Sequence, residues 1–354
     1  MRKNNFNIIR FILASFVIFC HNIELLEGDR KNEILYLLFK SPMSIGKLSV
    51  NLFFLISGYL IVKSWDKNNN AWTFLSNRIL RIYPGFIVAS IISCFLLGPF
   101  AGNENYFNEF DYRNFFTGLL LLKDPITPPI FIGSFYAFIN GPLWTINNEF
   151  VCYLIVLLLG LITFIKNKIG WLLFFITFFI IMTIGVVFNI EIIRNFFSNI
   201  IIAEFFEIHW FFSFFIGGTY YLFGRPYLNR KPIIILTAII MLINFYYNGK
   251  VEYALPIFGG YLLLSFAERT IPFLSNFNKL PDISYGIYLY GWPISKFLIF
   301  YQPKISYWLL NVESFFIAIL FGLFSWYLIE KPSINIKKKN KIEEQNLENS
   351  LSMT

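Results

Sequence analysis

Arg10 and His21 are the first residues of this sequence whose type and spacing could do chemistry, because both interrupt an otherwise apolar stretch. A charge at the centre of a membrane-spanning helix costs about 2.5–3.5 kcal/mol on insertion scales, and such residues usually have a function. Eleven residues of helix make three turns plus about 20°, so the two side chains share one face about 16 Å apart. A histidine there suits acid–base or nucleophilic catalysis. Alternatively, Arg10 extends to the lipid headgroups and His21 only ends its helix.

Two further basic residues, Arg78 and Arg81, are suited to ligand binding because residues three apart share a helix face. Their guanidiniums could hold phosphate oxygens in pairs, which would suit a nucleotide-bearing donor such as CoA. The alternative is that they are ordinary positive residues at the cytoplasmic edge of a membrane span.

Acidic and amide residues enter a later apolar stretch, where Glu149 directly follows Asn147 and Asn148. Glu149 could orient a histidine or bind a sugar, or it could simply be solvated at the start of a helix, whose positive dipole end favours an acidic side chain. A second polar group could line an outward-facing cavity or form a wet patch at the membrane interface, and its members are Glu204, Glu207 and His209.

The composition predicts that these residues are positioned by an all-α, polytopic integral membrane protein. Apolar residues make up 56% of the 354 residues and charged residues only 14%, with a mean hydropathy of +0.60. Soluble domains carry about 25% charged residues, so lipid must cover most of this chain. Apolar stretches predict ten transmembrane helices, over residues 6–21, 48–62, 79–100, 143–165, 171–189, 200–223, 232–247, 251–267, 284–301 and 306–329.

The basic residues predict the orientation of these helices, because cytoplasmic loops carry an excess of lysine and arginine. With both termini in the cytoplasm, inner segments hold 18 of the 29 lysines and arginines and outer segments hold nine. The net charge of +8 is therefore explained by topology and not by binding of nucleic acid. The apolar run 115–122 is too short to cross, so we expect an interfacial or re-entrant piece within the outer loop 101–142.

Several segments, taken in order along almost the whole chain, resemble the membrane-bound acyltransferase 3 family, whose members acylate glycans and some lipids or peptides. Arg10 and His21 match its arginine, ten residues, histidine signature. Residues 51–59 resemble its Phe-Phe-x-x-Ser-Gly-aromatic helix, and residues 78–84 resemble its Arg-x-x-Arg-x-x-Pro segment. Residues 144–149, with Tyr153, resemble its Trp-Ser-Leu-x-x-Glu block. Residues 284–289 resemble its Ser-Tyr-x-x-Tyr-Leu motif, and residues 330–332 resemble the close of its last span.

The resemblance implies ten helices, His21 as the central catalytic residue and an acyl-CoA donor bound from the cytoplasm. We therefore expect an O-acetyltransferase of the bacterial cytoplasmic (inner) membrane, with acetyl-CoA as donor, a glycan or lipid-linked saccharide as acceptor, membrane lipid around it, no metal and no nucleic acid. Residues 1–332 would form the acyltransferase 3-like transmembrane domain and 333–354 a disordered cytoplasmic tail. The expected site residues are His21 and Glu149 for catalysis, Arg10, Arg78 and Arg81 for the donor, and Ser57, Trp144, Tyr153, Tyr285 and Tyr288 as cavity lining.

Two positions depart from the family pattern. Many members have His-x-Pro after the Tyr-Leu motif, whereas this chain has Gly291, Trp292 and Pro293, and a mechanism that depends on that histidine is questionable here. Asn51 stands where relatives often carry an acidic residue.

Two mechanisms and two other functions stay open at this point. His21 could deprotonate the acceptor hydroxyl, with Glu149 or a nearby polar group orienting its ring, or it could carry the acyl group itself. A carbohydrate transporter or a lipid-linked glycan flippase would also need a polar path through many helices. A glycan polymerase is less favoured, because the outer loop 101–142 has only two basic residues, Arg113 and Lys123.

Overall fold

The computed structural model describes residues 4–188, 190, 209–247 and 251–336, and every regular element among them is a helix. The prediction of an all-α chain is confirmed for this part of the sequence. The helices are α1 Phe6–Glu27, α2 Ile34–Phe39, α3 Ile45–Lys67, α4 Ala71–Ile91, α5 Gly98–Ala101, α6 Tyr106–Glu109, α7 Tyr112–Leu121, α8 Trp144–Leu161, α9 Lys168–Val187, α11 His209–Thr219, α12 Lys231–Tyr246, α13 Val251–Ala254, α14 Gly260–Ala267, α15 Pro272–Ser275, α16 Ser284–Tyr301 and α17 Tyr307–Ser325.

Short π-helical and 3-10 segments extend several of these helices. The π-helical ones are Ile92–Leu97, Tyr220–Gly224, Leu255–Gly259 and Trp326–Glu330, and the 3-10 turns are Gly141–Leu143, Arg225–Tyr227 and Asn276–Lys279. The last helical stretch continues to Ile336, beyond the boundary expected at residue 332. The rest of the expected tail, residues 337–354, lies outside the described part of the chain.

Six of the described helices are long and apolar enough to cross a membrane, namely Phe6–Glu27, Ile45–Lys67, Ala71–Ala101, Gly141–Leu161, Lys168–Gly185 and Tyr307–Ile336. Each coincides with an expected span. Two more expected spans form shorter apolar helices, Lys231–Tyr246 and Val251–Ala267. The span expected over 200–223 is described only from His209 onward. The count of ten and the side of the termini therefore stay predictions.

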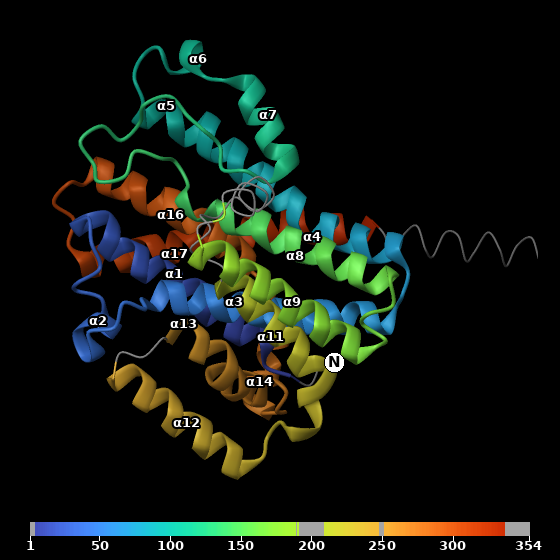
Figure 1. Cartoon of the computed structure of the whole chain (residues 1–354). Coiled ribbons are helices and arrows are strands. Elements are labelled where there is room, and N and C mark those ends of the chain that lie inside the picture. The colour runs from blue at the N-terminus through green and yellow to red at the C-terminus, as the bar shows by residue number, and fades with distance from the viewer. Residues whose placement is uncertain (1–3, 189, 191–208, 248–250, 337–354) are drawn as a thin grey trace, which may run out of the picture.

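Helix α16 also coincides with an expected span, but it does not reach the hydropathy of the six. It packs against α17, α1 and α4 (Figure 1), and eleven of its 18 residues are buried. Neighbouring helices shield its polar side chains, and ionisable residues within membranes are tolerated where they face the interior of a helix bundle. Because several helices pack against it, α16 is well placed to line a binding site between them.

Helix α3 lies at the centre of the bundle because it packs closely against α11, α1 and α8. Gly58 and Gly217 make the contact with α11 possible, since a Cβ on either would overlap the backbone of the other helix, at Phe214 and Leu55 respectively. Small residues permit this close approach between membrane helices. The Ser-Gly pair of the sequence motif thus has two roles, with Gly58 packing and Ser57 facing the site.

The segment between α4 and α8 lies beside the bundle at the top of Figure 1 and carries α5, α6 and α7. Helix α7 has ten residues, and at about 1.5 Å per residue it is too short to cross a bilayer. Residues 131–138 of this segment return to the bundle and contact α1 and α16.

Candidate active site

His21 lies near the end of α1, where its ring has two partners. Its Nδ1 is 3.3 Å from Oε2 of Glu24, three residues further along the helix. Its ring edge meets Trp292 of α16, with 4.8 Å between the ring centroids. A carboxylate that accepts a hydrogen bond from Nδ1–H leaves Nε2 as the basic nitrogen, which is the arrangement of a general base or nucleophile.

Glu24 is itself fixed by two other residues. Arg30 donates to Oε2 from Nε at 3.0 Å and from Nη2 at 2.5 Å, and the Tyr136 hydroxyl donates to Oε1 at 3.0 Å. Two donors from one guanidinium give a directional, charge-assisted contact. The result is a carboxylate held in one orientation beside His21.

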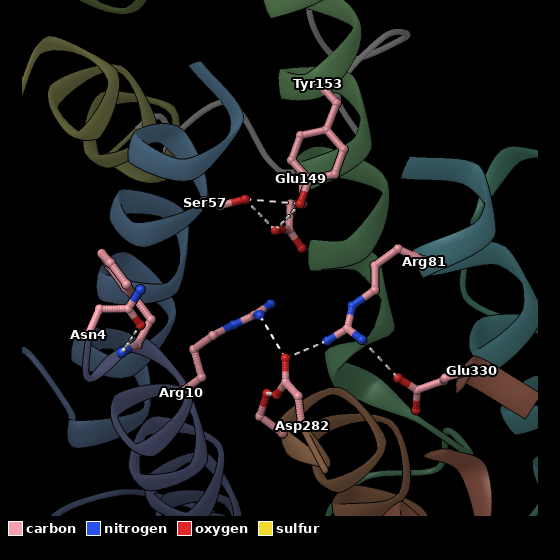
Figure 2. Close-up of polar contacts among 10 residues, drawn as sticks. Asn4, Arg10, Ser57, Arg81, Glu149, Tyr153, Asp282 and Glu330 are labelled. Atoms are coloured by element: carbon pink, nitrogen blue, oxygen red, sulfur yellow. Dashed lines mark hydrogen bonds and ion pairs between the residues drawn. The ribbon is translucent and has the colours of Figure 1, made fainter. Parts of the chain in front are cut away.

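Glu149 does not orient His21. Its Oε1 accepts hydrogen bonds from Ser57 at 2.6 Å and from Tyr153 at 2.5 Å (Figure 2). The structure therefore brings Glu149 together with two of the expected cavity residues, but Glu24 takes the part of the carboxylate next to the histidine. The i, i+3 spacing of His21 and Glu24 on one helix was a signal in the sequence that could have identified this pair.

Arg10 and Arg81 meet at Asp282, which lies two residues before the start of α16 and was not expected. Its Oδ2 is 3.0 Å from Nη1 of Arg10 and 2.7 Å from Nη2 of Arg81, and Figure 2 shows the carboxylate between the two guanidiniums. Burial opposes ionisation of Asp282, but the two arginines outweigh it and hold its pKa at about 2. Arg81 also lies 3.5 Å from Oε2 of the buried Glu330.

Arg78 differs from these two arginines, because no carboxylate among the described residues pairs with it. Its buried Nε has no hydrogen-bond partner in this part of the chain, and its guanidinium lies 5.8 Å from the ring centroid of Phe74. The charges of Arg81, Glu149 and Arg10 all act on it. Arg78 is thus the guanidinium best placed to receive an anionic ligand, with Arg10 and Arg81 beside it.

The expected common face of α1 is confirmed. Arg10 contacts Asp282 at the start of α16, and His21 contacts Trp292 eleven residues later. One side of α1 therefore carries a cation and an imidazole toward the same neighbouring helix, about 16 Å apart.

Comparison with known proteins identifies the group to which this arrangement belongs. Residues 3–331 match the acyltransferase 3 family, described as "Acyltransferase domain". The chain belongs to the acyltransferase 3 family. It is 26% identical to an O-acetyl transferase of Shigella phage Sf6, over 94% of this chain and 96% of the relative. It is 28% identical to Nodulation protein 10 of Rhizobium leguminosarum bv. viciae, over 95% of this chain and 94% of the relative. No solved structure matches it.

The remaining expected residues of this acyltransferase connect helices around the site. The Tyr285 hydroxyl donates to the backbone oxygen of Ile82 at 2.9 Å and so joins α16 to α4. The Tyr288 hydroxyl lies 2.6 Å from Oγ1 of Thr145 and joins α16 to the first turn of α8. Trp144 packs against Trp210 of α11, with 4.3 Å between ring centroids.

Gly291, where many acyltransferase 3 members have a histidine, packs against Ile18 of α1. A Cβ there would be 2.6 Å from Cγ1 of Ile18, so a larger side chain would collide with α1. We expect Gly291→His to destabilise the protein by about 1–3 kcal/mol through overpacking. Thermal unfolding in detergent checks this, and adding Ile18→Ala should restore part of the lost Tm. Equal Tm values for wild type and Gly291→His would contradict the prediction.

Asp124, in the loop after α7, gives a pH-dependent prediction. Burial raises the pKa of its carboxyl to about 8, from 3.8, and Oδ1 has no partner among the described residues. Between about pH 4 and pH 8 the folded protein keeps a proton that the unfolded chain releases, so stability falls as the pH rises through this window. Asp124→Asn removes the effect. Its gain in Tm over wild type should grow from pH 5 to pH 8, and a gain that stays constant would refute the assignment.

Proposed function

We propose that this membrane acyltransferase moves an acetyl group from cytoplasmic acetyl-CoA to a hydroxyl of a surface polysaccharide or of its lipid-linked precursor. The observation that carries the proposal is the face of α1, which has the His21–Glu24 pair at one end and Arg10 toward the other. Arg78 and Arg81 of α4 lie beside Arg10, and these three arginines form the guanidinium cluster. The phage relative is named an O-acetyl transferase, which supports acetyl as the group and oxygen as the acceptor atom. The transporter and flippase alternatives are not favoured, because the matched family is one of acyltransferases.

The donor would place its phosphates at Arg78, with Arg10 and Arg81 adding positive charge. Guanidiniums bind phosphate oxygens through paired, charge-assisted hydrogen bonds. Asp282 holds Arg10 and Arg81 in position, whereas Nε of Arg78 has no hydrogen-bond partner in the described part of the chain. The flexible pantetheine arm of CoA would then extend along α1 and carry the thioester toward His21.

At the thioester, Nε2 of His21 would take the proton from the acceptor hydroxyl as its oxygen bonds to the carbonyl carbon. The bond from carbon to sulfur breaks, CoA leaves as the thiolate, and the imidazolium returns the proton to it. Glu24 would stabilise the imidazolium, a role that does not require Glu24 to be protonated. The second route, in which Nε2 attacks the thioester and carries the acetyl group before the hydroxyl accepts it, uses the same residues.

We also propose how the chain is placed in the membrane. Residues 1–332 form one transmembrane domain with ten helices in the bacterial cytoplasmic membrane, and both termini face the cytoplasm. The guanidinium cluster, near the start of α1, then faces the cytoplasmic donor, and His21 lies toward the side where surface glycans are displayed.

The proposal is tested in a deletion strain complemented with wild type, His21→Ala, or the double variant Arg78→Ala and Arg81→Ala, with membrane levels matched. NMR of the surface polysaccharide measures its O-acetyl content. We expect wild type to restore the acetate and neither variant to do so. Normal acetate in the deletion strain, with normal polysaccharide export, would contradict a polysaccharide acceptor.

A further inference from the structure

Four buried polar side chains near the first turns of α8 have hydrogen-bonding atoms without a partner in the described part of the chain. They are both side-chain atoms of Asn148, Nε2 of His209, and the indole nitrogens of Trp210 and Trp292. Each of these residues is at most 4% exposed. Buried polar groups are nearly always paired in native structures, so a group of unpaired ones requires an explanation.

The aromatic rings connect these groups to one another and to His21. Trp292 contacts His21, and a Cβ on Gly141, just before α8, would lie 3.2 Å from its indole ring. One turn later Trp144 packs against Trp210, whose ring centroid is 4.9 Å from that of His209.

Asn148 lies a further turn along α8, on the same face as Trp144. The group therefore runs from the catalytic histidine, along the first turns of α8, to the start of α11. Its members come from three helices that are far apart in the sequence.

The chemistry of this group differs from that of the guanidinium cluster. It offers an amide that can donate and accept, two indole N–H donors, an imidazole nitrogen and flat apolar rings. One cation, Lys47 of α3, acts electrostatically on His209. The guanidinium cluster, in contrast, contains three arginines and is therefore suited to phosphates. Neutral hydrogen-bonding groups beside aromatic faces match a sugar ring, which presents hydroxyls at its edge and an apolar face of C–H groups.

His209 in particular is better explained by a ligand than by the membrane interface. A wet interfacial patch would expose it, yet its side chain is buried. Glu204 and Glu207, which the sequence placed with it, lie outside the described residues.

We infer that Asn148, His209, Trp210 and Trp144 bind the sugar of the acceptor and present its hydroxyl to His21. This inference rests on the proposed function and names the place of its second substrate. The bound hydroxyls supply the partners that Asn148, His209 and Trp210 lack among the described residues.

Asn148→Leu and Trp210→Phe test the inference on the purified full chain in detergent. The probe is the oligosaccharide repeating unit of the polysaccharide from the deletion strain, which carries no added acetate. We expect its KM to rise about tenfold or more in either variant, as expected for hydrogen bonds lost from a desolvated site. The KM for acetyl-CoA should stay within about twofold of wild type, because the donor binds elsewhere.

Thermal unfolding separates this role from a structural one. Removing an unpaired buried amide in exchange for an apolar side chain of similar size is neutral or stabilising, so Asn148→Leu should keep or raise the Tm. The matched control is Trp171→Phe, which changes a buried tryptophan whose indole donates to Thr219 at 3.0 Å, and it should leave both KM values unchanged. A lower Tm with both KM values raised for Asn148→Leu would overturn the inference.

Binding of the same oligosaccharide without acetyl-CoA, measured by calorimetry, distinguishes failure of this inference from failure of the proposed function. Acetyl transfer by wild type with unchanged oligosaccharide KM and affinity in both variants would overturn the sugar site and leave the acetyltransferase standing. Oligosaccharide binding that both variants weaken about tenfold, with no transfer by wild type, would support the sugar site and overturn the acetyltransferase.

Discussion

Replacing His21 with glutamine is expected to lower the rate of acetyl transfer by about 10²- to 10⁴-fold, the usual contribution of a general base. Glutamine keeps a polar group of similar size next to Glu24 and Trp292, but it cannot take a proton from the acceptor. Affinity for acetyl-CoA should stay close to that of wild type, because the guanidinium cluster is untouched. The rate is measured on purified protein with radiolabelled acetyl-CoA, and donor affinity by calorimetry.

Glu24 provides the matched comparison for this prediction. Glu24→Gln removes the charge that steadies the imidazolium and should lower the rate by a smaller factor than His21→Gln. Glu27→Gln, one turn later on α1, changes an exposed glutamate whose Oε2 accepts from Asn32 and should have no effect. Near-normal rates for His21→Gln, or equal effects of the two glutamate changes, would refute the roles given to this pair.

Replacing Arg78 with methionine is expected to weaken the binding of acetyl-CoA about 10- to 100-fold. Hydrogen bonds to charged groups contribute about 1.5–3 kcal/mol each, and each 1.4 kcal/mol is a factor of ten in affinity. The binding of acetyl-pantetheine, which carries the same thioester without the phosphates and the nucleotide, should be unaffected. Comparing the two donors by their KM values and inhibition constants therefore isolates the phosphate contact.

Arg113→Met is the control for this change, because Arg113 is an exposed arginine of α7, outside the guanidinium cluster. It should leave the binding of both donors as in wild type. Arg81→Met, in contrast, leaves Glu330 without an ion pair among the described residues and should mainly lower the yield of folded protein. An Arg78→Met variant that loses the same affinity for acetyl-CoA and acetyl-pantetheine would show that Arg78 does not bind phosphate.

Features governed by local periodicity were predictable from the sequence. The all-α class and six of the spans follow from apolar stretches, and the shared face of Arg10 and His21 follows from the helical repeat. Motif order also indicated the family, which the comparison with known proteins confirms. Helix α16 was found as well, since its apolar residues are dense enough to mark a span even though eleven of its 18 residues are buried among neighbouring helices.

Contacts between distant segments were not predictable. Asp282 meets Arg10 across 272 positions, and Tyr136 meets Glu24 across 112 positions. No periodicity within one helix specifies such partners, so the expectation that Glu149 orients the histidine could not be checked against Ser57, which lies 92 positions away. The contact of Glu149 with Tyr153, four residues along α8, follows the helical repeat. The sequence also could not predict that a larger side chain at position 291 would collide with α1, because this depends on how closely α16 approaches Ile18.

The most direct test of the account uses purified protein in sealed proteoliposomes, with radiolabelled acetyl-CoA on one side and the oligosaccharide repeating unit on the other. We predict that wild type releases free CoA and labelled, O-acetylated oligosaccharide in equal amounts, and that His21→Gln forms neither above the background without protein. Oligosaccharide that crosses the bilayer unmodified, with acetyl-CoA intact, would contradict acyl transfer and make this chain a glycan transporter.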